Sequence, residues 1–160
     1  MDKNTLAIVR ESYGRCAMQA TFFEDFYETF MRSSPEIMPF FDKTNMAKQR
    51  QLLREGISFM ILFADNNAGG EMAIEHIGKI HDVKHVNVRP ELYPLWINSL
   101  LECIGKHDKH HNEEIRDAWK AVLDIGIRRF IAMYRPQKAE SEAAVENESA
   151  AAQTEEQAAS

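Results

Sequence analysis

His81 and His85 are the two residues of this sequence whose types and spacing most directly suggest chemistry. They stand four positions apart in HDVKHVNVRPELY, residues 81–93. On a helix this spacing presents two imidazoles on one face, as in a zinc pair, and Asp82 would take the place of the acidic base of a zinc hydrolase. The zinc hypothesis is weak, because it needs a third ligand from elsewhere and because Pro90 requires the chain to leave the helix near His85.

The position of His81 favours a different role. Ile74, Ile77 and His81 recur at the spacing of one helix face, so His81 is expected on a buried apolar stripe. Such a histidine is either a core residue bonded to a carbonyl or the ligand of a buried group, and spacing alone leaves both open. His85 belongs to the corner that follows, and the remaining histidines are expected on other faces or in a solvated turn (His76, His107, His110 and His111).

Aromatic residues are concentrated in one short part of the chain. Seven of the fifteen Phe, Tyr and Trp residues fall between positions 22 and 41. This density fits either simple core packing or the wall of a pocket for a flat aromatic cofactor. Tyr27 is the polar one among the seven.

Helical signals define the elements that must position these residues. Apolar residues recur at helical spacing along most of the sequence. Thr21 and Glu24 form a capping box, Ser34-Pro35-Glu36 offers another helix start, and Thr44 or Asn45 can cap a helix that ADNNAGG (64–70) ends. Further helices are predicted from about 71 to 83, from Pro90 onward, and from about 112 to 135. The fold is therefore predicted to be all-α, with six to eight helices joined by short corners.

The composition predicts one folded domain and a tail. The chain is long enough for a single globular domain, predicted at residues 1–136. Residues 137–160 have one Lys against six Glu, with Ala, Ser and Gln between them, which predicts a disordered acidic tail. Since this tail carries −5 of the net charge of −6, the domain is nearly neutral and has no basic field for nucleic acid.

Two further properties limit where the chain is expected to work. No stretch approaches the roughly 18 apolar residues of a membrane span, and the amphipathic start MDKNTLAIVRESYGRC lacks the pattern of a signal peptide. Cys16 and Cys103 lie far apart in sequence, give neither a disulfide framework nor a metal-binding pair, and are predicted as small core residues. We therefore expect a cytoplasmic protein with no membrane partner.

The order of these features resembles the bacterial globins, in particular the globin domain of flavohaemoglobins and the single-domain haemoglobins akin to it. FYETFMRSSPEIMPFF (26–41) is similar to their second and third helices, and MAKQRQLL (46–53) to the segment with the distal glutamine and leucine. HDVKH (81–85) and RPELY (89–93) are similar to their proximal segment. The resemblance covers about residues 5–135 and implies a globin fold around a pocket for haem b.

The resemblance also implies roles on the iron and distal sides of the pocket. His81 matches the iron ligand, which leaves the opposite axial position open for O2, CO or NO. Tyr27 and Gln49 match the distal pair that stabilises bound O2 by hydrogen bonds. Phe41 matches the phenylalanine that stacks on the haem, and Leu53 matches the distal leucine, so both are expected to exclude water from the iron.

Further cofactor contacts are implied on the proximal side. Tyr93 matches a proximal-side tyrosine, and Val88 is expected against the cofactor. The second ring nitrogen of His81 needs an acceptor, for which we expect a backbone carbonyl of the same helix near Ile77. Cations near the pocket mouth offer partners for haem propionates, and the sequence does not choose among them (Lys48, Lys84, His85 and Arg89).

Three departures from the flavohaemoglobin pattern bear on catalysis. No flavin or nicotinamide reductase domain is expected after the globin-like part. Counting from Trp119, the glutamate that pairs with the proximal tyrosine and histidine in flavohaemoglobins falls near Pro136, and no acid lies between Ile125 and Gln137. The corner from His81 to Pro90 is also two residues longer. A push effect on the iron and a self-sufficient catalytic cycle are therefore not expected.

The resemblance implies a haem protein that reversibly binds O2 and other diatomic gases such as NO and CO, for oxygen storage or transport. Activity as a nitric oxide dioxygenase would depend on an external reductase, so the question of catalysis stays open. One alternative is a gas-sensing globin that signals to a separate partner protein, which the lack of an output domain disfavours. Another is a globin-fold regulatory module without haem, which the matches at His81, Phe41 and Gln49 disfavour.

Overall fold

The computed structural model describes the backbone of residues 1–158 and the side chains of residues 1–134 and 142–148. Its elements, in chain order, are α1 (Lys3–Ala17), α2 (Phe22–Ser33), η1 (Met38–Phe41), α3 (Met46–Ala64), α4 (Ala68–Ile80), η2 (Pro90–Leu92), α5 (Tyr93–His107) and α6 (Glu113–Ala158). The two η elements are short 3-10 helices, and the described residues include no strand. The predicted all-α fold with six to eight helices is confirmed.

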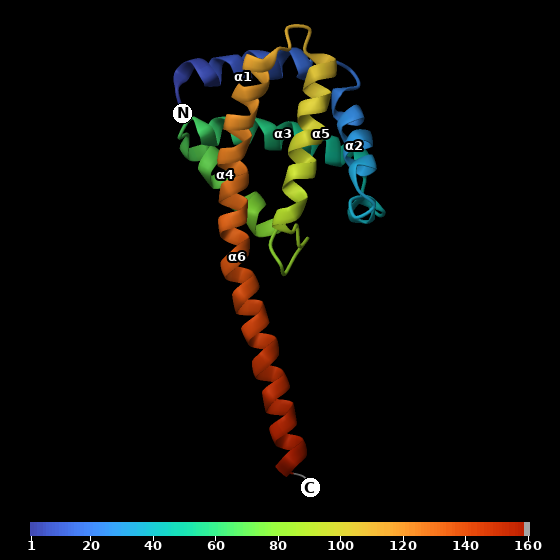
Figure 1. Ribbon diagram of the computed structural model, residues 1–160, viewed down its shortest axis with the longest axis vertical. Helices are drawn as coiled ribbons and strands as arrows, with labels where there is room; N and C mark the ends of the chain where they lie inside the picture. The colour runs from blue at the N-terminus through green and yellow to red at the C-terminus, as the bar shows by residue number, and fades with distance from the viewer. Residues whose placement is uncertain (159–160) are drawn as a thin grey trace.

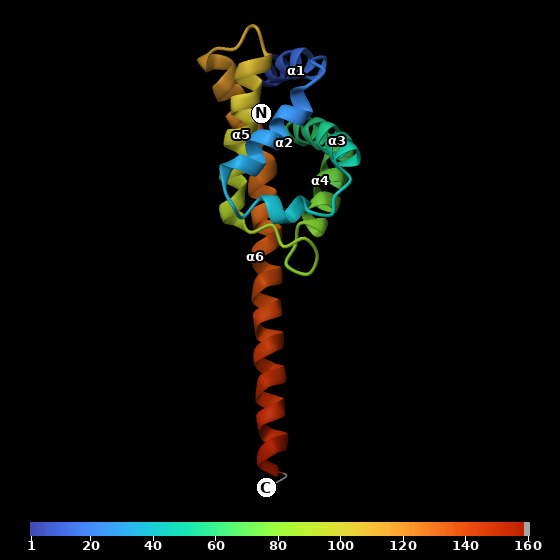
Figure 2. The same ribbon diagram turned by 90° about the vertical axis from the view of Figure 1, so that its right-hand side faces the viewer.

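The helices enclose the region between α2 and α6. In Figure 1, α1 lies across one end of the body, where it packs on α6. Helix α3 packs on α4 and α6, and α2 packs on α5. Turned by 90°, the ribbon shows α2, η1, α3 and α4 following one another in a ring beside α5 and α6 (Figure 2). This arrangement brings the segment between α2 and α3 next to the loop after α4, and Arg89 pairs with Glu36 between them at 2.7 Å.

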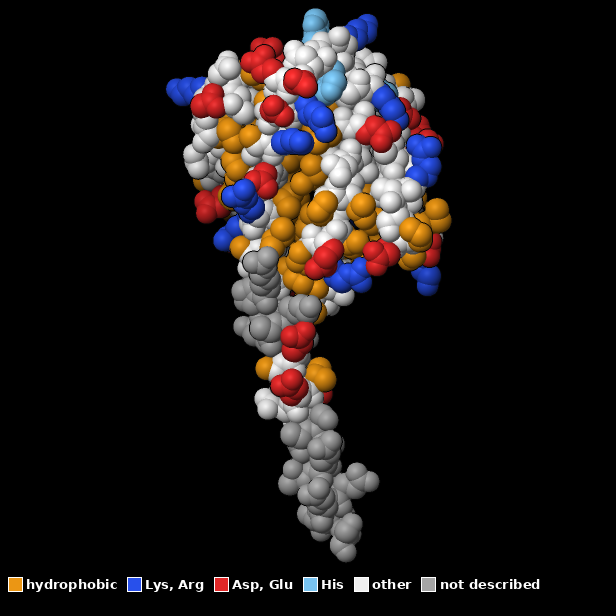
Figure 3. All heavy atoms as spheres, viewed as in Figure 1, with side chains coloured by type: hydrophobic (Ala, Val, Ile, Leu, Met, Phe, Trp, Pro, Cys, Tyr) orange, Lys and Arg blue, Asp and Glu red, His pale blue; other side chains and the backbone are white. Residues whose placement is uncertain are grey.

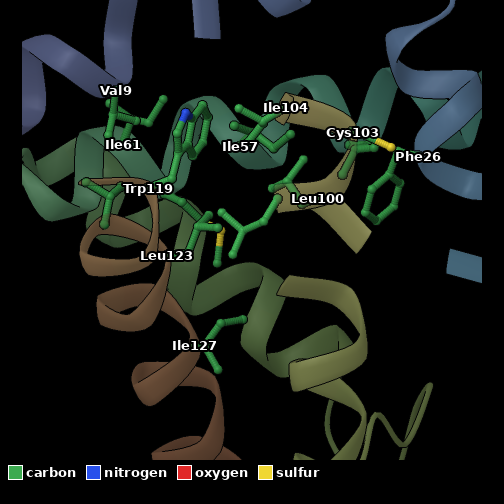
Figure 4. Packing of buried hydrophobic residues seen from close by; sticks show 14 of the residues in the cluster. Val9, Phe26, Ile57, Ile61, Leu100, Cys103, Ile104, Trp119, Leu123 and Ile127 are labelled. Carbon is green, nitrogen blue, oxygen red and sulfur yellow. The ribbon is translucent and has the colours of Figure 1, made fainter. Parts of the chain in front are cut away.

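The core is built around one face of α6. Trp119, Leu123 and Ile127 are spaced one helical turn apart and point toward side chains of α3 and α5 (Figure 4). Trp119 is fully buried, and its Nε1–H donates to Ser12 Oγ of α1 at 2.9 Å, so its polar group is satisfied. On the face seen in Figure 3, hydrophobic side chains also gather along the seam between α6 and α5.

Two of the predicted helix starts differ in the structure. Thr21 precedes α2, but its side chain makes no capping hydrogen bond, so the predicted capping box is wrong. Ser34 begins a turn, and only the 3-10 helix Met38–Phe41 follows, because Pro39 lacks the N–H that an α-helix would need there. Asn45 caps α3 by accepting a backbone N–H, as predicted.

Helix α4 begins and ends three residues earlier than the predicted range of 71 to 83. The Asn67 side chain accepts from Gly69 N at 2.9 Å and Gly70 N at 3.2 Å, which fixes the start of the helix. His81 is already the C-terminal cap residue. Asn87 in the following loop has a φ of 53°, a left-handed conformation that asparagine tolerates better than most residues.

Helix α6 continues to Ala158, whereas the sequence predicted a disordered tail from residue 137. In Figures 1 and 2 its second half extends away from the body, and residues 142–148 are exposed. Ala and Glu both favour helix strongly, which explains a helical backbone in a segment with little apolar surface to bury. The division into a domain at 1–136 and a separate tail stays a prediction. None of the helices in the described part of the chain is long and apolar enough to cross a membrane.

Candidate functional site

A cavity of about 380 Å³ lies within the helical body. Its walls come from α2, η1, α3, α4, the loop 81–89, α5 and α6. All eight residues that the sequence predicted for a cofactor site line it: Tyr27, Phe41, Gln49, Leu53, Ile77, His81, Val88 and Tyr93. The structure therefore brings them together, while their individual roles toward a ligand stay predictions.

His81 lies in the cavity wall directly after α4. Its backbone N–H donates to the carbonyl of Ile77 at 3.0 Å, and its own carbonyl accepts from Val88 N at 3.0 Å, so the loop returns to the residue where it began. Burial lowers the pKa of the imidazole to about 4, because the charged form loses its hydration. The ring is therefore neutral at physiological pH and keeps a lone pair for a metal.

Tyr93 orients the imidazole of His81. Tyr93 Oη lies 3.3 Å from His81 Nδ1, and burial raises the pKa of the phenol, which therefore stays neutral. The predicted acceptor, the carbonyl of Ile77, binds the backbone N–H of His81 instead, because His81 still takes part in the last turn of α4. With Nδ1 held by Tyr93, Nε2 is the nitrogen left for a ligand in the cavity.

Phe130 of α6 packs against both of these residues. Its ring centroid lies 5.4 Å from that of His81 and 5.9 Å from that of Tyr93. The count from Trp119 placed the position of the flavohaemoglobin glutamate near Pro136, whose side chain lies outside the described residues. Helix α6 approaches α4 at Gly78, where a Cβ would lie 2.5 Å from a side-chain atom of the neighbouring turn of α6 and 3.4 Å from Phe130 Cδ1.

His85 lies outside the cavity that His81 lines. Its side chain is 63% exposed, and its Nδ1 is 2.7 Å from Asp82 Oδ1, which also accepts from the backbone N–H groups of Lys84 and His85. Because α4 ends before His81, the spacing of four residues no longer places the two imidazoles on one face. The described residues contain no group of three or more His, Cys, Asp or Glu side chains placed to hold a metal ion. The zinc hypothesis therefore finds no support.

Tyr27 of α2 reaches across to α3. Its hydroxyl donates to the backbone carbonyl of Gln49 at 3.3 Å, and its ring packs edge-on against Phe26 and Phe41, with centroids 5.0 and 5.4 Å away. Burial raises the pKa of the phenol to about 12, so the hydroxyl keeps its proton. The Gln49 side chain is partly buried in the cavity wall, and Leu53, one turn further along α3, is buried.

Of the four cations predicted near the mouth, Arg89 forms an ion pair between two segments that line the cavity. Its guanidinium pairs with Glu36 at 2.7 Å, and the chain neighbours of these two residues, Val88 and Ile37, both line the cavity. The Arg89 side chain is half exposed. The other three are also exposed, and none of the four lines the cavity itself (Lys48, Lys84, His85 and Arg89).

Most of the cavity lining escaped the sequence analysis. The remaining lining residues are almost all apolar: Phe30, Ile37, Phe40, Thr44, Leu52, Gly56, Met60, Ile80, Val86, Leu92, Trp96, Ile127 and Phe130. Leu53, Gly56 and Met60 have the helical spacing of one face of α3. Val86 and Phe130 carry no such local signal, because their positions depend on how a loop and a distant helix approach α4. Several of the lining residues are 37–49% exposed, which gives the cavity an apolar rim (Phe40, Leu52, Ile80 and Val86).

The donor set of this cavity fits haem. Aromatic and aliphatic side chains form nearly all of its wall, as a flat apolar ring requires. A neutral imidazole is a common protein ligand of haem iron, and the hydrogen bond between Tyr93 and Nδ1 supplies the second contact that orients such a ring.

Comparisons with known proteins agree with this geometry. The family model described as Globin matches residues 24–128. A flavohemoprotein of Rhodopirellula baltica is 29% identical over 147 residues, which cover 86% of this chain and 35% of that protein, so the chain spans about a third of the length of this relative. A crystal structure of a protein from Pseudomonas aeruginosa PAO1, described as structurally highly homologous to a human hemoglobin, has a TM-score of 0.79 and 37% identity, and the match covers 82% of this chain and 98% of that one.

Proposed function

Because this chain belongs to the globin family, which implies a haem and a gaseous ligand, we propose that its cavity holds haem b through Nε2 of His81 and that the protein binds diatomic gases reversibly. One observation carries the proposal: a neutral imidazole, held at Nδ1 by Tyr93, lies in the wall of an apolar cavity lined by all the other predicted site residues. Bound haem would supply an iron that binds O2, CO or NO.

On the side of His81, the residues of the chain would hold this imidazole in place for the cofactor. Tyr93 accepts from the Nδ1–H of His81, which sets the tautomer and leaves the lone pair on Nε2. The bonds from His81 to Ile77 and Val88 hold its backbone at the start of the loop. Since the imidazole pKa is about 4, protons do not compete for Nε2 near pH 7.

On the other side of the pocket, Tyr27 and Gln49 provide hydrogen bonds for a gas ligand, with Tyr27 as the principal donor. The Tyr27 ring is buried between aromatic neighbours, so only its hydroxyl has to turn toward the ligand. Phe41 and Leu53 keep water away, which protects a reduced iron from oxidation. The Arg89 guanidinium beside the mouth is the partner that we propose for a propionate.

Oxygen storage or transport is the activity that these residues support best. Turnover of NO and O2 to nitrate is a second candidate, supported by the similarity to a flavohemoprotein, and it would take electrons from an external reductase. The free thiols Cys16 and Cys103 are both buried, which suits the reducing cytoplasm that we propose as the location. No observation of its own favours a sensing role toward a partner protein.

Visible absorption spectra of the purified chain test the proposal directly. We expect a Soret band, and we expect reversible band shifts when the reduced protein meets O2, CO or NO. Protein that purifies without haem is mixed with free haem and measured again. A chain that is folded by circular dichroism and yet gives no Soret band after this reconstitution would reject the haem site.

A further inference from the structure

Resting on the proposed haem site, we propose that Gly56 of α3 is a specificity-determining residue for the cofactor. Its missing side chain makes room for the bulky apolar edge of the macrocycle, which in haem b carries two vinyl groups. Gly56 thus selects a macrocycle by the size of the groups at one edge, and it makes no polar contact with the cofactor.

Gly56 lies in the middle of the face that α3 turns toward the cavity. Its neighbours on that face are Leu52 and Leu53, one turn earlier, and Met60, one turn later, and all of them line the cavity. Among the described lining residues Gly56 is the one glycine, so the cavity wall is bare backbone at this point. Helical spacing directs a Cβ added to Gly56 into the cavity.

Packing between helices does not explain this glycine. At Gly70, Gly78 and Gly126 an added Cβ would lie 2.5, 2.5 and 2.8 Å from the nearest atom of another helix, so these residues have to be small. A Cβ added to Gly56 would have no such atom within 4 Å. Since glycine in the middle of a helix destabilises it relative to alanine, a bare position on the cavity wall points to a group bound in the cavity.

The side chain of Met60 leaves the same part of the wall uncovered. A Cβ on Gly126 would lie 2.8 Å from Met60 Cε and 3.3 Å from Met60 Cγ, so the end of Met60 packs against α6 where Gly126 has no side chain. No atom of Met60 lies within 4 Å of a Cβ built on Gly56. Two glycines on different helices therefore shape this end of the cavity: one takes up the methionine, and the other leaves the wall bare.

The exposure of the lining residues decides which edge of the cofactor lies beside Gly56. Leu52 and Ile80 at the rim are half exposed, whereas Leu53, Met60 and Ile127 are buried. Carboxylates are costly to bury, so the propionates of haem stay at the rim and the opposite, apolar edge enters the buried end. The vinyl groups of that edge then lie between Leu53 and Met60, beside Gly56.

Haem loss from chains loaded with macrocycles that differ only at this edge tests the role. Haem b, mesohaem, which has ethyl groups in place of the vinyl groups, and deuterohaem, which has hydrogen atoms there, are bound in turn to the wild-type chain and to Gly56→Ala. The rate of loss to an excess of a haem-scavenging protein is then measured. Because overpacking a filled site is costly, Gly56→Ala should lose haem b and mesohaem about tenfold faster than wild type, and deuterohaem at within about twofold of the wild-type rate.

Gly14→Ala is the matched control. Gly14 is an exposed residue inside α1, a Cβ there likewise has no neighbouring atom within 4 Å, and the residue does not line the cavity. This variant should leave all three loss rates unchanged. Gly56→Leu extends the series, since its larger side chain should widen the difference between haem b and deuterohaem.

The comparison among macrocycles separates a fit to the cofactor from a general loosening of the fold. A substitution that only disturbs α3 would speed the loss of all three macrocycles by the same factor. Such an equal effect in Gly56→Ala, or three unchanged rates in both Gly56 variants, would overturn this inference alone. A wild-type chain that gives no Soret band with any of the three macrocycles would instead overturn the proposed haem site.

Discussion

The hydroxyl of Tyr27 donates to the backbone carbonyl of Gln49, with 3.3 Å between the two oxygens. Two residues predicted to act as a distal pair are thus joined through the main chain of α3, and not through the side-chain amide. A bond of this length between neutral groups contributes about 1 kcal/mol or less. Tyr27 can therefore exchange it for a bond to a ligand in the cavity without rebuilding the pocket.

Tyr27→Phe is expected to raise the O2 dissociation rate about tenfold, because a lost hydrogen bond of about 1.4 kcal/mol corresponds to a factor of ten. Gln49→Leu should have a smaller effect, since ordering the glutamine side chain opposes its bond by up to about 2 kcal/mol of entropy. Stopped-flow measurement of the O2 dissociation rate in both variants shows which of the two side chains is the stronger donor. CO release, which depends less on a donor, serves as the control. A larger rate increase in Gln49→Leu would reverse the two roles.

His81→Ala should abolish the Soret band of the purified protein or leave the haem loosely held, while His85→Ala should retain it. The reason is position: His81 lines the cavity with a neutral ring, whereas His85 is largely exposed and engaged with Asp82. Haem content per chain, measured by the pyridine haemochrome assay, distinguishes the two variants. Equal haem content and unchanged ligand spectra in His81→Ala would contradict the assignment.

What the sequence could predict was local. Ile74, Ile77 and His81 share a helix face because of their spacing alone, and the structure has all three in or beside the cavity and core. Asn45 as a cap of α3 could also be predicted, because a helix cap depends only on the next few residues along the chain.

What the sequence could not predict depends on how distant elements meet. Only the resemblance placed Tyr93 on the proximal side; spacing could not, because the hydrogen bond between Tyr93 and the ring of His81, 12 positions away, depends on a loop that folds back before α5 begins. Phe130 joins them only because α6 crosses α4 at a glycine, Gly78. The Arg89–Glu36 pair likewise connects residues 53 positions apart. The spacing of residues along one helix predicts which of them share a face, but it does not predict which distant segments contact one another.

Gly70→Ala should destabilise the fold, whereas Gly14→Ala should not. A Cβ on Gly70 would lie 2.5 Å from Phe63 N and 2.7 Å from the carbonyl carbon of Leu62, both backbone atoms that cannot rotate away. Overpacking of this kind costs about 1–3 kcal/mol. Gly14 lies inside α1, and a Cβ added there would have no neighbouring atom within 4 Å. Gly14→Ala should therefore raise the free energy of unfolding by about 0.5–1 kcal/mol. Urea denaturation of the two variants measures both effects, and equal midpoints would contradict the close contact of α3 and α4.

Truncation after Gln137 should leave the thermal midpoint and haem content unchanged. Tyr134, whose hydroxyl donates to Asn87 Oδ1 at 2.9 Å, ties α6 to the loop after His81 and is retained in the shortened chain. Residues 142–148 are exposed and offer little apolar surface beyond Val145 and alanines. The comparison is a second variant that is truncated further, so that Tyr134 is also removed, and its thermal midpoint should be lower. A large drop in the first variant would show that the segment after residue 137 contributes to the fold.

The ion pair between Arg15 and Asp108 gives the last prediction. Arg15 Nε lies 2.6 Å from Asp108 Oδ1, and Nη2 lies 3.0 Å from Oδ2, which ties α1 to the turn after α5. Burial alone would raise the pKa of Asp108, whose side chain is inaccessible to solvent, but the hydrogen bonds from Arg15, Ser12 and the backbone of His110 outweigh it and lower the pKa to about 2.

The sign of the pH effect follows from this direction. Because the folded state holds the carboxylate at a pKa below the ordinary value near 3.9, the stabilisation is complete above about pH 4 and is lost as the pH falls through about 2. The shift corresponds to about 2 kcal/mol at neutral pH. Asp108→Asn should therefore lower the free energy of unfolding by about 2 kcal/mol at pH 7, and its difference from wild type should shrink between pH 4 and pH 2. Urea titrations at these pH values, with the exposed Asp117→Asn as control, measure the difference, and a gap that stays constant down to pH 2 would mean that the charge of Asp108 is not what stabilises this corner.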